Sequence, residues 1–190
     1  MALQKYARIA PQLPYRSILI IATEGEKTEP LYFRLFRNNR NFVLHILGSR
    51  KKTSPLQVFN AALSASKKMH IKSRDEVWIV IDKDSWQTDR LNELCVKCAE
   101  NHFELAVSNP NFEYWLLLHF EEGNSIKTAH ECMHRLTRYL PNYRKNKLEL
   151  QKLSPLVRDA VVHARKRDDP PCDVPAHFGS RLYRLVEKLL

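Results

Sequence analysis

Acidic side chains directly follow two apolar segments of this sequence, in a pattern that suits a hard metal ion. Glu24 comes shortly after the apolar residues 17–22, and Asp82 and Asp84 come after the apolar residues 76–81. Three carboxylates with open coordination positions favour Mg²⁺, which keeps several waters and takes phosphate oxygens as further ligands. Mn²⁺ accepts the same oxygen ligands. We therefore expect these three carboxylates to hold Mg²⁺ or Mn²⁺ and to act on phosphate groups.

Basic residues are placed where they could bind those phosphates. The formal net charge is +10, from 31 Lys and Arg against 21 Asp and Glu. Such a surface favours polyanions, because neutralising phosphates releases condensed counterions. A basic surface that only keeps the protein soluble is the alternative. The residues best placed to bind phosphate are Lys27 and, in the loop after residues 42–47, Arg50, Lys51 and Lys52.

The elements that must position these residues alternate between strand and helix. Short segments rich in β-branched and aromatic residues predict strands at 17–22, 42–47, 76–81 and 103–108. Between them, helical spacing recurs over 28–38, Ser54-Pro55-Leu56-Gln57 predicts a helix with a capping box, and Asn109-Pro110 predicts a capped helix start. This alternation predicts an α/β fold with a largely parallel sheet and right-handed crossovers.

The strand order 2-1-3-4 would make the first and third strands neighbours. Open parallel sheets bind ligands beyond the carboxyl ends of their strands, where the strand order reverses. Neighbouring strands lie roughly 4.8 Å apart, so carboxylates at those two ends could share one ion. The sheet therefore predicts a single site containing Glu24, Asp82 and Asp84.

The chain divides into three parts on these patterns. Residues 1–16 form an N-terminal segment, residues 17–120 form the α/β domain, and residues 121–190 are expected to form a helical extension packed on the same domain. No apolar run approaches the roughly 18 residues of a membrane span, and the N-terminus lacks the apolar stretch of a secretory signal. The four unevenly spaced cysteines favour a reducing compartment. We expect a cytoplasmic protein that does not contact membranes.

Two other groups of residues could bind zinc. His130-Glu131-Cys132-Met133-His134 matches H-E-x-x-H, in which two His share a metal and the Glu acts as a base in peptidases. No third ligand follows at a familiar spacing, although His163 is available, so a zinc peptidase is the weaker alternative. Cys95, Cys98 and His102 lie in a helical stretch, where buried thiols are the better interpretation.

Three segments resemble the RloB family, whose members are encoded beside restriction and abortive-infection loci, often with a partner ATPase. They are EGEKTEPLYF at 24–33, DKDSW at 82–86 and SNPNFEYWLLLHF at 108–120. A strand followed by Glu-Gly and a later strand followed by Asp-x-Asp also resembles the Toprim fold of topoisomerases, primases and small nucleases. The resemblance implies a Toprim-like, four-stranded sheet, a nucleic-acid substrate and a partner ATPase of the AAA or ABC type.

The resemblance also implies roles for single residues. Glu24 would be the general acid or base, and Asp82 and Asp84 the metal-binding pair. Residues with a supporting role would be Glu26 (a substitute for Glu24), Glu29, Asn109, Glu113 and His119. Because no Tyr sits in a topoisomerase context, the resemblance favours a Mg²⁺-dependent nuclease of RNA, with transfer RNA as one target, or of DNA, acting in antiphage defence. A non-catalytic subunit that binds nucleic acid or docks an ATPase is the alternative.

Overall fold

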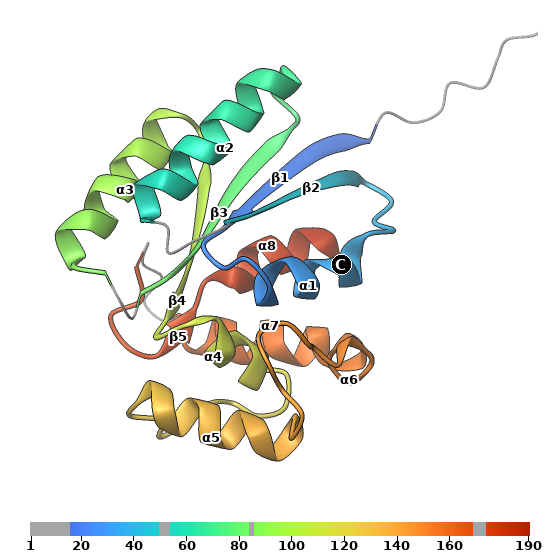
Figure 1. The fold of residues 1–190 in the computed structure, drawn as a ribbon, viewed down its shortest axis with the longest axis vertical. Coiled ribbons are helices and arrows are strands. Elements are labelled where there is room, and N and C mark those ends of the chain that lie inside the picture. Colours follow the sequence, from blue (N-terminus) through green and yellow to red (C-terminus); the bar gives the residue numbers. More distant parts are fainter. Residues whose placement is uncertain (1–15, 50–53, 84–85, 169–173) are drawn as a thin grey trace, which may run out of the picture.

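A five-stranded sheet lies between two layers of helices in the computed structural model, which describes residues 16–49, 54–83, 86–168 and 174–190 (Figure 1). The strands are β1 (Ser17–Thr23), β2 (Phe42–Gly48), β3 (Glu76–Asp82), β4 (Glu104–Asn109) and β5 (Gly179–Ser180). They lie in the order β2-β1-β3-β4-β5. The first four run parallel, and β5 runs antiparallel to β4.

The fifth strand corrects the expectation of four strands in the order 2-1-3-4, because it adds an edge strand from the last part of the chain. β5 contains only two residues, of which Ser180 pairs with Ser108 and Gly179 pairs with Asn109. Two residues are too few to show the alternation or the β-branched enrichment by which a strand is recognised. The residues after 121 therefore contribute a strand as well as helices.

Both faces of the sheet are covered, which explains the continuous apolar runs of the central strands. Because successive strand residues point to opposite faces, Ile20 packs against α2 (Pro55–Met69) and α3 (Thr88–Glu100), while Ile21 faces the other layer. That second layer consists of α1 (Thr28–Phe33), α4 (Phe112–Leu117) and α8 (Leu182–Leu189). Figure 1 shows α2 and α3 on one side of the sheet and α1 and α8 on the other.

The helix starts follow the expected chemistry in one case and depart from it in another. Ser54 precedes α2 and forms the predicted capping box, in which its side chain accepts from the Gln57 backbone and the Gln57 side chain accepts from its own. At the predicted start after the fourth strand, Asn109 still belongs to β4, its peptide bond to Pro110 is cis, and Asn111 is the N-cap of α4. The helix expected over 28–38 is α1 followed by a 3₁₀ turn, η1 (Arg34–Phe36).

The last third of the chain returns to the sheet. Its helical elements are α5 (Ala129–Tyr139), α6 (Leu150–Leu153), the 3₁₀ turn η2 (Ser154–Leu156), α7 (Val157–Lys166) and α8. On α8, Leu182, Leu185 and Val186 are fully buried in the same core as β1 and β3. None of the helices in the described ranges is long and apolar enough to cross a membrane.

Candidate metal and phosphate site

Glu24 and Asp82 lie together at the carboxyl ends of β1 and β3, as their positions in the sequence predict. The backbone N–H of Glu24 donates to the Val80 carbonyl at 3.1 Å, which continues the pairing of β1 with β3 by one residue. The backbone N–H of Asp82 then donates to Glu24 Oε2 at 3.2 Å. The Glu24 carboxylate, which follows β1, is thus held at the end of the neighbouring strand β3, next to the backbone of Asp82.

Trp86 fixes the other oxygen of the same carboxylate. Its indole Nε1 donates to Glu24 Oε1 at 3.0 Å. Both oxygens of Glu24 accept a hydrogen bond, and a carboxylate oxygen can take more than one partner. Sequence reasoning did not select Trp86, although the DKDSW segment contains it. An indole N–H next to an acidic cluster was the signal that could have found it.

Carboxylates at this edge have the chemistry of a Mg²⁺ or Mn²⁺ site, although the structure describes only part of the expected ligand set. Glu24 and Asp82 supply hard oxygen donors. Asp84 lies outside the described residues, as do the predicted phosphate contacts Arg50, Lys51 and Lys52. Within the described ranges, no group of three His, Cys, Asp or Glu side chains is arranged to hold a metal ion. The metal site therefore stays a prediction, with Glu24 and Asp82 as its candidate ligands among the described residues.

The turn after Glu24 is built around a buried carboxyl group, that of Glu29. Glu29 is only 6% exposed, and its Oε1 accepts from the Gly25 backbone N–H at 3.0 Å. A Cβ atom at position 25 would overlap the Glu29 carboxylate, so glycine is required for this contact. Burial raises the pKa of Glu29 to about 7, and the nearby Glu113 adds to the effect. Glu26 and Lys27, also in this turn, are exposed.

Glu113 brings a second buried carboxyl group to the same region. It lies on α4, is buried, and accepts a hydrogen bond at 2.8 Å from the hydroxyl of Tyr143. Burial, reinforced by the charge of Glu113, raises the pKa of the Tyr143 hydroxyl, which therefore remains a donor at neutral pH. Nothing in the sequence indicated that Tyr143, between α5 and α6, would reach α4.

Asn109, at the end of the neighbouring strand β4, forms hydrogen bonds with a segment from the last part of the chain. Its side-chain amide donates to the carbonyls of Pro175 at 3.0 Å and His177 at 2.8 Å. Lys83 Nζ also donates to the Pro175 carbonyl, at 2.8 Å. These hydrogen bonds hold the segment before β5 against the carboxyl ends of β3 and β4.

His119 lies in the apolar core, where both of its ring nitrogens are engaged. Nδ1 is 3.1 Å from the Trp115 carbonyl and donates to it, so Nε2 accepts from the Tyr32 hydroxyl, 3.2 Å away. Burial lowers the pKa of His119 to about 4, which keeps the ring neutral. This geometry gives His119 a structural role rather than a direct place among metal ligands.

The H-E-x-x-H segment forms the start of α5. Thr128 Oγ1 accepts from the Glu131 backbone N–H at 3.0 Å, and Glu131 Oε2 accepts from the Lys127 backbone N–H at 3.0 Å. His130 and His134 are exposed on the helix surface. The residue that would be the peptidase base is thus a capping residue. Of the other thiol candidates, Cys98 packs in the core against α2, and burial raises its pKa to about 12.

Comparison with known families gives a match that spans all the elements described above. A family model described as RloB-like protein matches residues 19–189. The chain belongs to the RloB-like family. In this RloB-like chain the match extends from β1 to α8, so the family pattern includes the C-terminal helices. Neither the comparison with curated proteins nor that with solved structures found a match.

Proposed function

We propose that this RloB-like chain is a metal-dependent nuclease with a Toprim-like site, which acts in antiphage defence. The observation that carries the proposal is the Glu24 carboxylate, held at the end of β3 by the Asp82 backbone and Trp86. Two acidic residues on neighbouring strand ends of a parallel sheet match what a phosphodiester-cleaving metal site requires. The net charge of +10 suits a polyanionic substrate.

The proposed mechanism divides the work among a few side chains. Asp82, with Asp84, would hold Mg²⁺ or Mn²⁺, and such an ion would supply polarisation of a phosphate and stabilisation of charge on the leaving oxygen. Glu24 moves a proton to or from the reacting oxygen as general acid or base. Trp86 orients Glu24 through its indole N–H. Lys27, which is exposed in the adjacent turn, would contact phosphate.

A cleavage assay tests this proposal. Labelled transfer RNA and plasmid DNA are incubated with the protein in Mg²⁺, in Mn²⁺ and in EDTA. Glu24→Gln and Asp82→Asn should each lower the cleavage rate by on the order of 10²-fold or more, because proton transfer and metal binding each contribute at that scale. Glu93→Gln is the matched control, since Glu93 is an exposed carboxylate on α3 whose only ion pair in the described residues is with Lys97.

The outcomes separate the nuclease from its alternatives. Cleavage that survives in both variants contradicts the assigned site. Tight binding of nucleic acid with no cleavage under any condition favours a non-catalytic subunit, or one that acts with an AAA or ABC-type ATPase. Stoichiometric zinc that is lost in His130→Ala would instead revive the peptidase interpretation.

A further inference from the structure

A short basic turn connects α5 to α6 and carries three cations on its surface. We define the basic turn as residues 141–147. A backbone bridge closes it, with Lys147 N–H donating to the Arg144 carbonyl at 2.8 Å. Arg144, Lys145 and Lys147 are exposed. A cavity of about 400 Å³ is lined by Pro141, Asn142, Tyr143, Arg144, Asn146 and Lys147.

Two hydrogen bonds attach the basic turn to the elements of the candidate site. Thr28 Oγ1, at the start of α1, donates to the Lys145 carbonyl at 3.0 Å. The Tyr143 hydroxyl donates to Glu113 on α4 at 2.8 Å. The charge of Lys145 also acts on Glu29, the buried residue under the turn that follows Glu24. The basic turn is therefore placed beside the loop that leads from β1 into α1.

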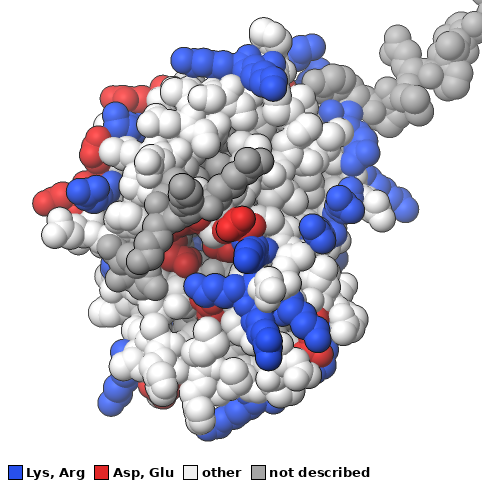
Figure 2. All heavy atoms as spheres, viewed as in Figure 1, with Lys and Arg blue, Asp and Glu red and all other residues white. Residues whose placement is uncertain are grey.

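The charge distribution on this face agrees with that placement. Figure 2 shows Asp and Glu side chains in a hollow at the middle of the face, with Lys and Arg side chains gathered beside it. In the same view, α1 and the chain leading from α5 to α6 lie at this position (Figure 1). An acidic centre with a basic margin suits a metal-dependent reaction on a polyanion, since the cations attract the phosphates that the carboxylates would repel.

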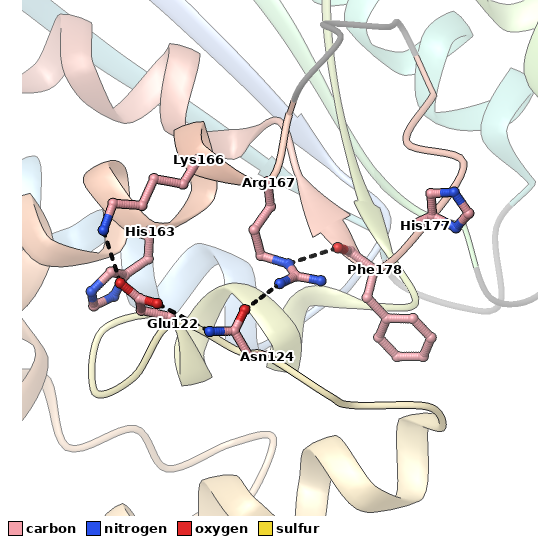
Figure 3. Close-up of a pocket in the computed structure, with 7 residues that line it drawn as sticks. All are labelled: Glu122, Asn124, His163, Lys166, Arg167, His177 and Phe178. Carbon is pink, nitrogen blue, oxygen red and sulfur yellow. Dashed lines mark hydrogen bonds and ion pairs between the residues drawn. The ribbon is translucent and has the colours of Figure 1, made fainter.

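A second pocket with basic residues differs from the basic turn, because its cations already form an ion pair or hydrogen bond with other side chains of the protein. This pocket of about 330 Å³ is lined by Glu122, Asn124, His163, Lys166, Arg167, His177 and Phe178 (Figure 3). Lys166 pairs with Glu122 at 2.8 Å, and Arg167 donates to Asn124 Oδ1 at 2.9 Å. Within the described ranges, the side chains of Arg144 and Lys147 in the basic turn make no such pair.

We propose that the basic turn binds the phosphodiester backbone of the nucleic-acid substrate beside the candidate metal site. This inference rests on the proposed function and names the surface that holds the substrate. The turn offers cations and the amides of Asn142 and Asn146, while its aromatic residue, Tyr143, is half-buried and bonded to Glu113. These cations and amides can donate to phosphate oxygens, so we expect binding through the basic turn to weaken as the salt concentration rises.

A binding measurement in EDTA tests the basic turn separately from cleavage. Fluorescence anisotropy follows a labelled RNA hairpin and a DNA duplex of the same sequence at several salt concentrations. The triple variant Arg144→Gln, Lys145→Gln, Lys147→Gln should bind about tenfold more weakly or worse. Its log K against log salt slope should be shallower by about 0.7 to 0.9 for each phosphate that the variant no longer neutralises. Comparison of the two probes shows whether the turn binds RNA, DNA or both.

The control variant also loses three positive charges, but from the layer of helices on the opposite face of the sheet. Lys67→Gln, Lys68→Gln and Arg90→Gln alter exposed cations of α2 and α3, and this triple variant should bind as wild type does. Equal binding and equal salt slopes for the two triple variants overturn the inference, as does a wild-type protein that binds neither probe. Parallel cleavage in Mg²⁺ separates the two proposals. Binding through the turn without cleavage overturns only the nuclease, and cleavage with normal binding by the turn variant overturns only the inference.

Discussion

Glu29 places a carboxyl group where almost no water reaches it, beside the turn that carries Glu24. Its pKa is raised to about 7, chiefly by burial, against an ordinary value of 4.5. The folded protein therefore keeps this proton up to a higher pH than the unfolded chain does. By linkage, the contribution of Glu29 to stability is present below about pH 4.5 and is lost as the pH rises toward 7.

Replacing Glu29 by Gln should remove this dependence on pH. The amide oxygen can still accept from the Gly25 N–H, and the side chain no longer ionises. We expect Glu29→Gln to raise the free energy of unfolding at pH 8 by at most about 3 kcal/mol, since one pKa unit corresponds to about 1.4 kcal/mol. The gain should shrink toward zero at pH 4. Urea unfolding at both pH values measures it, with the exposed Glu26→Gln as control, and equal stability of Glu29→Gln and wild type at pH 8 contradicts the prediction.

At the scale of single residues, the sequence predicted that Glu24 and Asp82 lie at neighbouring strand ends, but not what holds the Glu24 carboxylate. Glu24 and Asp82 follow apolar strands, and the rule for parallel strand ends places them together. Trp86 lies beside the acidic segment, and its indole N–H was the only local signal of its contact with Glu24. Tyr143 contacts Glu113 on another element, so no local spacing could indicate that interaction. Asn109 is of a residue type that often caps helices. Its side-chain amide instead donates hydrogen bonds to the carbonyls of residues 175 and 177, because a segment from the last part of the chain lies against it.

Among the elements, those with strong local signals were predicted well and the short ones were not. The four main strands were each found to within two residues, and the capping box of α2 is confirmed. β5 was missed because its two residues gain their strand conformation only from pairing with Ser108 and Asn109. Tertiary contacts, and not the local sequence, determine such an element.

The start of α5 provides a prediction at this scale, because it separates capping from metal binding. Thr128→Ala removes the side-chain oxygen that accepts from the Glu131 N–H, and should lower the free energy of unfolding by about 1 kcal/mol. His130→Ala alters an exposed side chain and should change it by less than about 0.5 kcal/mol. Chemical denaturation with and without zinc measures both. A larger loss for His130→Ala, or stabilisation by zinc, would show that this helix holds a metal.

The whole molecule depends on contacts between the early strands and the last part of the chain. Ser108 and Ser180 hydroxyls are 2.7 Å apart, and Asn109 and Lys83 both donate to the segment before β5. The candidate site edge is therefore bordered by residues that are some 70 or more positions apart in the sequence, as the separation of Ser108 and Ser180 shows.

Asn109→Asp should loosen this border. The substitution keeps the shape of the side chain but removes the N–H donors, and it sets carboxylate oxygens against the carbonyls of Pro175 and His177. We expect a loss of about 2 kcal/mol in the free energy of unfolding. Amide hydrogen exchange should become faster in residues 174–180. The exposed Asn92→Asp is the control, and unchanged exchange in that segment would contradict the assigned role of Asn109.

The late position of β5 and α8 has a consequence for how the protein is made. A ribosome adds residues from the N-terminus onward, so residues 179–189 emerge after every other described element. Until they do, Leu19 and Ile21 of β1 lack the α8 side chains that share their core, and Ser108 lacks the Ser180 hydroxyl with which it pairs. The nascent chain therefore cannot complete the edge that carries Glu24 and Asp82. During synthesis of the protein, the edge that carries the candidate site is therefore complete only after α8 has packed against the sheet.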